Sequence, residues 1–227
     1  MNTLETLYEL AREHAGTGAI AAFDWDDTCI SGDLGVTALA YADQADGGDR
    51  LARYLDLDAK HGHAVSYPFS TTVFAGFTRD ELHALGERAF DAAIQTGVLG
   101  ERPWVRPLMD TLRENGWQVW VITASTAACI EPIAARYGVP RERLIGMELL
   151  PNLDGHLTDV LALPAPYGVH KPAAFLERAG RAPTLALSDS PSDIALLEMA
   201  KHPVAVGASP QLAEHARAKG WLHLERP

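Results

Sequence analysis

The sequence is poor in lysine and cysteine, has an excess of acids over bases and contains no long apolar run. Of its 227 residues, 19 are Lys or Arg and 30 are Asp or Glu, which gives a formal net charge of −11. A general nucleic-acid-binding protein needs a basic surface to displace counterions from phosphates, so this acid excess argues against that class. No apolar run approaches the roughly 20 residues that span a bilayer, and we expect no contact with membranes.

The scarcity of cysteine bears on the compartment. Cys29 and Cys129 are too few for a disulfide framework, so a reduced, cytoplasmic setting is the default expectation. Residues 1–16 carry acids inside their apolar pattern and lack the basic leader of a signal peptide.

The fractions of hydrophobic residues (47%) and charged residues (22%) are those of a globular chain with a sizeable core. A monomer and a homodimer are both compatible with this composition.

Short apolar runs alternate with helical patterns along most of the chain. The apolar runs cover residues 19–23, 117–122, 144–149, 184–187 and 203–207. Runs of this kind, bounded by polar turns, are typical of buried parallel strands. The helical patterns cover residues 2–15, 104–115, 126–138, 171–180, 191–201 and 209–219. This alternation predicts an α/β fold built on a doubly wound parallel sheet.

Residues 31–103 break the alternation. They contain no convincing buried strand, only helical patterns at 34–45, 49–59 and 79–95. We therefore expect a small, mostly helical insert at 31–103, and an α/β core made of residues 1–30 and 104–227.

Polar side chains follow the predicted strands at the point where ligands bind in open α/β sheets, the carboxyl ends. Asp24 and Asp26 follow the first apolar run, Thr123 follows the second and Asp189 follows the fourth. Lys171, one of only four lysines in the chain, lies before the fourth run. Carboxylates on two strands, beside a hydroxyl and a scarce lysine, indicate a site for Mg²⁺ and a phosphoryl group.

The residue types also suggest a chemistry. Mg²⁺ binds through one or two carboxylates plus waters and phosphate oxygens, and Asp24 and Asp189 can supply those carboxylates. Thr123 and Lys171 suit the equatorial oxygens of a phosphoryl group, which need a hydroxyl donor and a fixed cation. A carboxylate can attack phosphorus to give an aspartyl-phosphate. An acid two residues away can protonate the leaving alkoxide and then activate a water molecule.

The ordered set of motifs resembles that of the haloacid dehalogenase superfamily of phosphatases, across the whole predicted core. The matching motifs are Phe23–Thr28 (an apolar residue, then Asp-x-Asp-x-Thr), Val121–Thr123, Lys171–Pro172, and Asp189 with Asp193. One departure is Ser188, where many relatives have glycine.

The resemblance implies a role for each matched residue. Asp24 would be the nucleophile and a metal ligand, and Asp26 the general acid/base, with its backbone carbonyl also on Mg²⁺. The other implied contacts are to the phosphoryl group, by Thr123 and Lys171, and to the metal site, by Asp189 and Asp193. The insert occupies the place of the helical cap in phosphoserine phosphatase-like members.

Asp33 is a candidate substrate residue. It lies nine residues after Asp24, and in phosphoserine phosphatase-like relatives an acid at that offset contacts the substrate amine. Aspartate is also a favoured N-cap, so Asp33 is equally suited to start a helix near Leu34. The two roles are compatible with each other.

Ser125 is expected to cap the helix after the second strand, with a phosphate contact as the alternative.

Aromatic residues give a second clue to the substrate. The segment 67–74 has no arginine where those relatives usually place one for a substrate carboxylate. Aromatic side chains with one acid can hold an alkylammonium group through cation–π attraction, which adds phosphocholine and phosphoethanolamine to phosphoserine as candidate substrates. The alternative is that these aromatics form the core of the insert; they are Tyr67, Phe69, Phe74 and Phe77.

We expect a Mg²⁺-dependent phosphomonoesterase that acts on a small-molecule phosphate ester. The presence of Asp26 argues against a dehalogenase, because the family's dehalogenases do not use a second aspartate in this role. A phosphotransferase or mutase with the same aspartyl-phosphate is an alternative. A catalytically inactive family member that only binds partners is another. A receiver-type phospho-acceptor module is shorter and lacks a helical insert.

Overall fold

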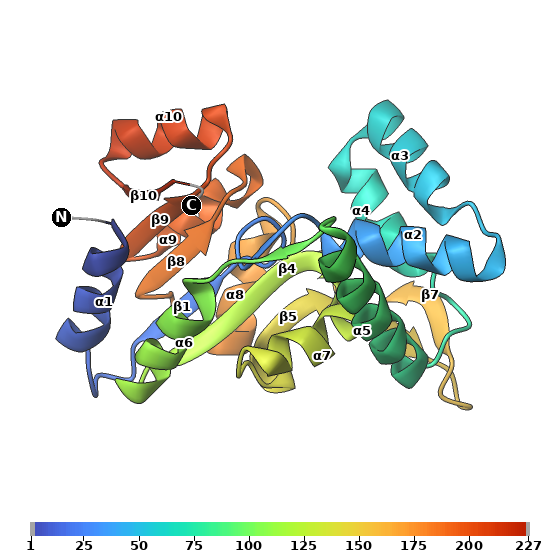
Figure 1. Ribbon diagram of the computed structural model, residues 1–227, viewed down its shortest axis with the longest axis horizontal. Helices are drawn as coiled ribbons and strands as arrows, with labels where there is room; N and C mark the ends of the chain where they lie inside the picture. The colour runs from blue at the N-terminus through green and yellow to red at the C-terminus, as the bar shows by residue number, and fades with distance from the viewer. Residues whose placement is uncertain (1–2, 226–227) are drawn as a thin grey trace.

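A six-stranded parallel sheet forms the centre of the computed structural model, which describes residues 3–225 (Figure 1). In order across the sheet, the strands are β10 (Leu222–Leu224), β9 (His202–Val206), β8 (Leu185–Ser188), β1 (Ile20–Phe23), β4 (Gln118–Thr126) and β5 (Leu144–Met147). From β1 the chain builds first toward β5 and then, on the other side, toward β10. The predicted doubly wound α/β fold is confirmed.

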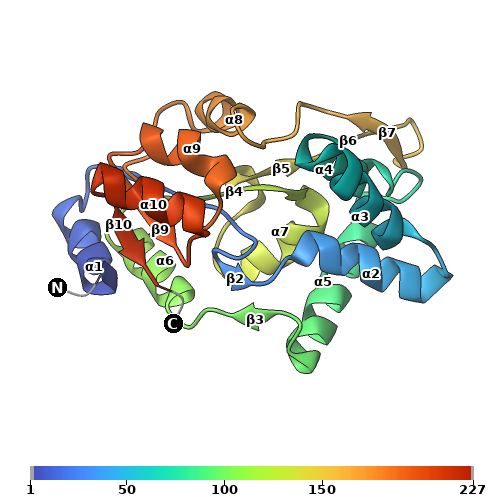
Figure 2. The same cartoon turned by 90° about the horizontal axis from the view of Figure 1, so that it is seen from above.

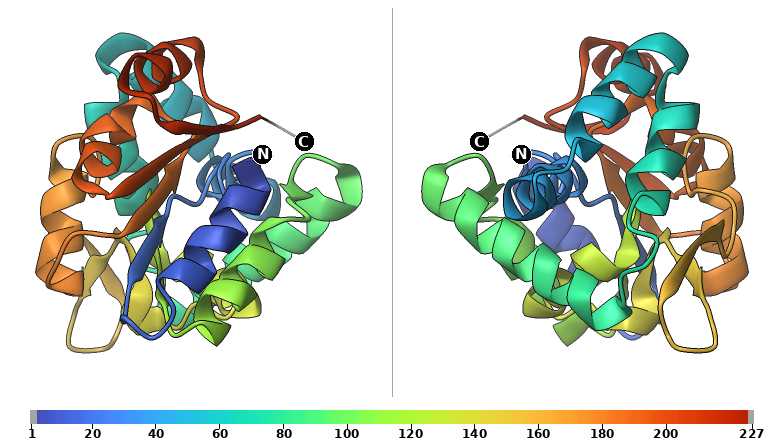
Figure 3. Two further views of the ribbon diagram at one scale, coloured as in Figure 1. Left: turned by 90° about the vertical axis from the view of Figure 1, so that its left-hand side faces the viewer. Right: turned by 90° about the vertical axis from the view of Figure 1, so that its right-hand side faces the viewer.

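Helices cover both faces of this sheet, because successive side chains of a strand point to opposite faces. On one face Phe23 and Val121 belong to an apolar cluster that includes α1 (Thr3–Glu13), α6 (Val105–Glu114) and α7 (Ala127–Arg136). On the other face Ala22 and Ile122 pack with α8 (His170–Ala179), α9 (Ile194–Met199) and α10 (Pro210–Lys219). Figure 3 shows α1 and α6 on one side of the sheet and α8 on the other.

Four helices lie within residues 31–103, where the sequence predicts a helical insert. They are α2 (Leu34–Asp46), α3 (Arg50–His61), α4 (His63–Thr72) and α5 (Arg79–Thr96), and they lie together at one end of the molecule (Figures 1 and 2). A short antiparallel pair, β2 (Ile30–Ser31) and β3 (Gly100–Glu101), joins the entrance of this segment to its exit. One continuous apolar cluster extends from the sheet into α2 and α5.

Local contacts explain where α2 starts and how closely α5 packs. The side chain of Asp33 accepts a hydrogen bond from the amide of Val36 over 2.8 Å, so its predicted capping role is confirmed. On α5, a Cβ added to Gly86 would overlap the backbone carbonyl of Cys129 in α7. Glycine therefore allows the two helices to approach closely.

Several elements were not predicted, among them helix α4, the β6–β7 hairpin and strand β10. Pro68 lies inside α4, and proline is usually read as a helix breaker. The antiparallel hairpin of β6 (Leu149–Pro151) and β7 (Leu157–Leu161) is short and largely exposed, so it lacks a buried apolar run. Strand β10 has only three residues.

Within the described residues, 3–225, no helix has both the length and the apolar character needed to cross a membrane.

Candidate active site

The sheet brings the predicted site residues together at its carboxyl edge. Asp24 directly follows β1, and its amide donates a hydrogen bond to the carbonyl of Leu187 in β8. Thr123 lies within β4, and Asp189 directly follows β8. Lys171 is the second residue of α8 and is buried. All of these except Leu187 line one pocket with a volume of about 140 Å³.

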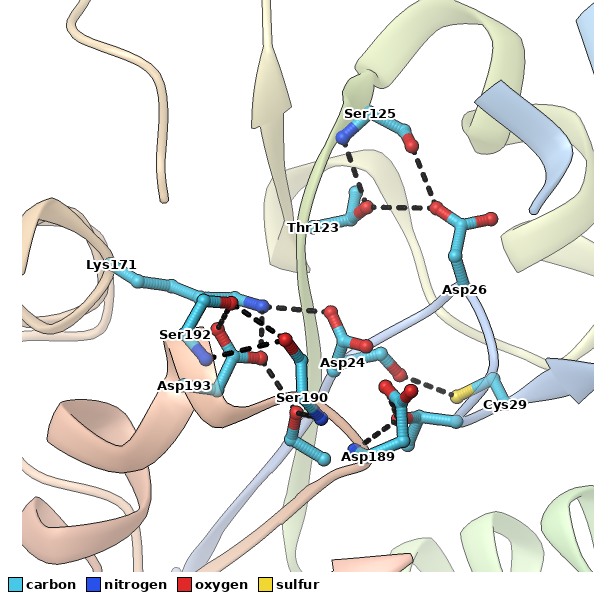
Figure 4. Close-up of polar contacts among 12 residues, drawn as sticks. Asp24, Asp26, Cys29, Thr123, Ser125, Lys171, Asp189, Ser190, Ser192 and Asp193 are labelled. Atoms are coloured by element: carbon cyan, nitrogen blue, oxygen red, sulfur yellow. Dashed lines mark hydrogen bonds and ion pairs between the residues drawn. The ribbon is translucent and has the colours of Figure 1, made fainter. Parts of the chain in front are cut away.

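Lys171 links Asp24, which follows β1, with Asp193, which lies in a short 3-10 turn five residues after β8 (Figure 4). Its Nζ lies 2.7 Å from Oδ1 of Asp24 and 2.5 Å from Oδ2 of Asp193. The hydroxyl of Ser188 donates a second hydrogen bond to the same oxygen of Asp193, over 2.7 Å. Asp193 therefore holds the lysine directly. Its predicted contact with a metal remains a prediction.

Asp26 lies in a separate hydrogen-bonded group in Figure 4, toward β4. Its Oδ2 accepts hydrogen bonds from Ser125 Oγ over 2.6 Å and from Thr123 Oγ1 over 3.3 Å. Its Oδ1 accepts one from the amide of Leu34 over 2.7 Å. The prediction that Ser125 caps α7 is wrong, because the cap is Thr126 and the Ser125 hydroxyl is directed to Asp26.

Asp189 is held by the loop that follows β1. Thr28 Oγ1 donates a hydrogen bond to Oδ1 of Asp189 over 3.2 Å and accepts one from its amide over 3.0 Å. Asp27, in the same loop, is a non-glycine residue with a positive φ of 54°. Its carboxylate accepts a hydrogen bond from the amide of Gly32, which closes the loop on itself. The first and fourth motifs are thus joined through Thr28.

The electrostatics around Lys171 favour its charged form. Burial acts to lower the pKa of the ammonium group, but Asp193 and Asp24 outweigh burial and hold the pKa above its ordinary value. Burial is also the largest cause of the raised pKa of Asp24, to which the charges of Asp193 and Asp189 add; the attraction of Lys171 opposes the rise. One lysine is therefore not enough to offset the buried carboxylates around it.

Three other acids of the pocket, Asp26, Asp33 and Asp189, have raised pKa values that show the same shortage of positive charge. Burial, with repulsion from Asp33, raises the pKa of Asp26 to about 8. Burial also raises the pKa values of Asp33 and Asp189 to about 6, and in both cases the charge of Asp27 adds to the shift. A cation bound among these carboxylates would relieve the repulsion.

The structure adds residues to the site that the sequence reasoning missed. Tyr54 of α3 and Tyr167, in the loop before α8, line the pocket together with the predicted Tyr67 and Asp33. No local pattern marks Tyr54. Tyr167 lies four residues before Lys171, and this closeness to a motif is the only sequence signal for it.

The aromatic residues of the insert divide between the two predicted roles. Phe74 is buried, and Phe69 and Phe77 pack against the same apolar cluster, so the prediction of a core role is confirmed for these three. Tyr67 packs against this cluster as well, but it also lines the pocket.

Comparison with known proteins identifies the family. A family model described as haloacid dehalogenase-like hydrolase matches residues 21–198, which include all four motifs. The chain belongs to the haloacid dehalogenase-like hydrolase family. Phosphorylcholine phosphatase of Pseudomonas aeruginosa is 28% identical to this hydrolase over 251 aligned positions, covering 82% of the chain and 72% of that protein.

Solved structures share the fold of this hydrolase. A Bordetella pertussis Tohama I protein of unknown function matches with a TM-score of 0.76 and 21% identity, covering 91% of this chain and 97% of its own. A phosphoserine phosphatase carrying an analogue of its phospho-aspartyl intermediate matches with a TM-score of 0.61 and 16% identity, covering 92% and 93% of the two chains. These structures confirm the fold, and the family assignment with the phosphatase relative bears out the predicted enzyme class, a phosphatase.

Proposed function

We propose that this protein is a Mg²⁺-dependent phosphomonoesterase that forms an aspartyl-phosphate on Asp24. The observation that carries the proposal is the position of Lys171, which bridges Asp24 and Asp193 in a pocket that Asp26 and Asp189 also line. This arrangement supplies a nucleophile, a fixed cation, and a second acid two residues from the nucleophile.

The donor set fits a magnesium ion. Among residues 3–225, no three His, Cys, Asp or Glu side chains are grouped so as to hold a metal unaided. Mg²⁺ does not require such a group, because it usually keeps several waters and takes oxygens from the substrate phosphate. Asp24, Asp189 and the backbone carbonyl of Asp26 would hold it. Its chemical contribution would be positive charge against the phosphate oxygens.

The chain's own residues then account for the two chemical steps. A carboxylate oxygen of Asp24 attacks phosphorus, and the bond from phosphorus to the ester oxygen breaks. Asp26, in its protonated form, gives its proton to the departing alkoxide. In the second step Asp26 takes a proton from a water molecule that attacks the aspartyl-phosphate, which releases inorganic phosphate and restores Asp24. The hydroxyl of Ser125 holds the Asp26 carboxyl group during both steps.

Lys171 and Thr123 are the proposed ligands of the phosphoryl group. The ammonium group of Lys171 carries three N–H donors. Two of them are used by the carboxylates of Asp24 and Asp193. A third donor remains for a phosphoryl oxygen. Asp193 and Ser188 then act as positioning residues that fix the ammonium group.

We also propose that residues 31–103 form a cap over a catalytic core made of residues 1–30 and 104–227. The pocket draws residues from both parts, with Tyr54 and Tyr67 from the insert and Asp24 and Lys171 from the core. A cap that closes over the phosphate would exclude water from the reaction.

The proposed substrate is a small phosphorylated amino-alcohol or amino acid, such as phosphocholine, phosphoethanolamine or phosphoserine. The position of Asp33 favours a substrate with an amine. Asp33 lines the pocket, and the family resemblance assigns this acid to the substrate amine. The relative whose name is phosphorylcholine phosphatase supports the same class.

A panel of phosphomonoesters tests the function. We expect phosphate release that requires Mg²⁺, stops on chelation and is lost in Asp24→Asn. Asp159→Asn, at an exposed position of the β6–β7 hairpin, serves as the matched control and should retain activity. Asp26→Asn should slow turnover of an alkyl phosphate by about 10²–10⁴-fold. Activity that survives Asp24→Asn would contradict the assignment of the nucleophile.

A further inference from the structure

Three tyrosines from separate segments line the pocket that holds the aspartates. Tyr54 comes from α3, Tyr67 from α4 and Tyr167 from the loop before α8. Tyr54 is buried, and the other two are half-buried. None of the three belongs to a catalytic motif, so the chemistry proposed above leaves their role open.

The rings of Tyr67 and Tyr167 meet at a right angle. Their centroids lie 4.9 Å apart with an interplanar angle of 87°. His63 stacks on Tyr67 at 4.7 Å with an interplanar angle of 10°, and its Nδ1 lies 2.6 Å from Oδ1 of Asp58. Two perpendicular rings, one of them supported by an anchored histidine, make a fixed aromatic corner in the pocket wall.

The charges of the pocket oppose a second anionic group on the substrate. Six aspartates line it, and Lys171 is its only lysine or arginine within the described residues. Lys171 is already shared between Asp24 and Asp193. Even with a divalent ion and a phosphate in place, no basic side chain remains for a substrate carboxylate.

The arginines of the neighbouring helix α3 are engaged elsewhere. Arg50 forms ion pairs with Asp43 and Asp46, and the guanidinium of Arg53 lies 5.0 Å from the ring centroid of Phe69. Neither residue lines the pocket. The pocket wall outside the catalytic group therefore combines aromatic rings with the carboxylate of Asp33.

We infer that Tyr54, Tyr67, Tyr167 and Asp33 bind the ammonium head of the substrate, which is the phosphate ester of an alkylammonium alcohol without a carboxylate. The inference rests on the proposed phosphatase function and narrows its substrate class. Aromatic faces attract a cation through their quadrupoles, most strongly where water is excluded, and quaternary ammonium groups are recognised in this way. Asp33 supplies the opposite charge.

Matched substrates test the inference. Phosphocholine and 3,3-dimethylbutyl phosphate have the same shape, but only phosphocholine carries the positive charge. We expect kcat/KM for phosphocholine to exceed that for the uncharged ester by about tenfold or more, and phosphoserine to be the poorest of the three.

Variants of the aromatic corner test the residues. Tyr67→Leu and Tyr167→Leu should lower the ratio of kcat/KM between the two esters, mainly through KM for phosphocholine. Tyr67→Phe and Tyr167→Phe keep the ring and should keep the ratio. Tyr41→Leu is the matched control, because Tyr41 lies in α2 and lines a different groove, between α2 and α5.

A ligand measurement covers the case in which the leucine variants do not fold. In the wild-type enzyme, choline should inhibit hydrolysis of p-nitrophenyl phosphate about tenfold more strongly than 3,3-dimethylbutanol. Equal inhibition, or equal kcat/KM for the two matched esters, overturns the ammonium site and leaves the phosphatase intact. A lack of hydrolysis of every ester, p-nitrophenyl phosphate included, overturns the proposed function and the substrate class with it.

Discussion

The backbone amide of Leu34 donates a hydrogen bond to Oδ1 of Asp26 over 2.7 Å. Leu34 is the first residue of α2, so the proposed acid/base is tied to the first turn of the insert. The same carboxyl group is tied to β4 through Ser125. Its orientation therefore depends on how α2 sits against the sheet.

Leu34→Pro removes this amide N–H and is expected to leave the rest of the helix intact, so it isolates the contribution of the hydrogen bond to Asp26. Proline is tolerated at the first position of a helix, and the extended backbone of Asp33 (φ −116°, ψ 110°) is compatible with a following proline. Leu34→Ala removes the same buried side chain but keeps the amide. Relative to Leu34→Ala, the proline variant should lose about 10- to 150-fold in kcat, since a hydrogen bond to a charged group contributes about 1.5–3 kcal/mol. Equal kcat in the two variants would show that the amide is dispensable.

Ser125→Ala should lower kcat by about tenfold through loss of its 2.6 Å hydrogen bond to Asp26. A double-mutant cycle supplies the control. In an Asp26→Asn background, the same serine change should have little further effect, because the two residues act as one unit. Additive losses in the cycle would mean that Ser125 acts on some other group.

Lys171→Met should destabilise the folded protein by about 3–5 kcal/mol, because it leaves the carboxylates of Asp24 and Asp193 buried without their cation. Urea denaturation measures this free energy of unfolding. Lys201→Met, at an exposed position, is the matched control and should stay within about 0.5 kcal/mol of the wild type. Similar small changes in the two variants would argue against a structural role for the lysine bridge.

The sequence predicted which residues meet in this pocket because most of them directly follow an apolar run that marks a buried strand. Asp24, Thr123 and Asp189 are of this kind, and the parallel sheet brings them to one edge. The partners that orient them were harder to predict. Nothing local marks Ser125 as a donor to Asp26, since a serine before a helix is usually read as its cap.

The tyrosines illustrate a second limit. Tyr54 and Tyr167 are 113 positions apart in the chain, and only the packing of α3 and α4 against the loop before α8 brings them into one pocket. Helix α4 was itself missed because Pro68 interrupts its pattern. Side chains that depend on the position of an unpredicted helix could not be assigned from periodicity alone.

Mg²⁺ should raise the melting temperature of the protein, because a ligand that binds only the folded state stabilises it. At 100 times its dissociation constant the gain is about 2.7 kcal/mol, or roughly 5–10 °C for a chain of this size. Asp189→Asn should remove most of this shift, whereas Asp159→Asn on the exposed hairpin should keep it. A shift that persists in Asp189→Asn would contradict the assignment of Asp189 as a ligand.

The most direct test of the account is the covalent state of Asp24 during turnover. Asp26→Asn should slow hydrolysis of the intermediate, so this variant is incubated with Mg²⁺ and a phosphomonoester with a good leaving group, quenched in acid and digested for mass spectrometry. The account predicts one added phosphoryl group on the peptide that contains Asp24, absent from Asp24→Asn. A phosphoryl group on another residue, or phosphate release with no adduct in rapid-quench samples, would contradict it.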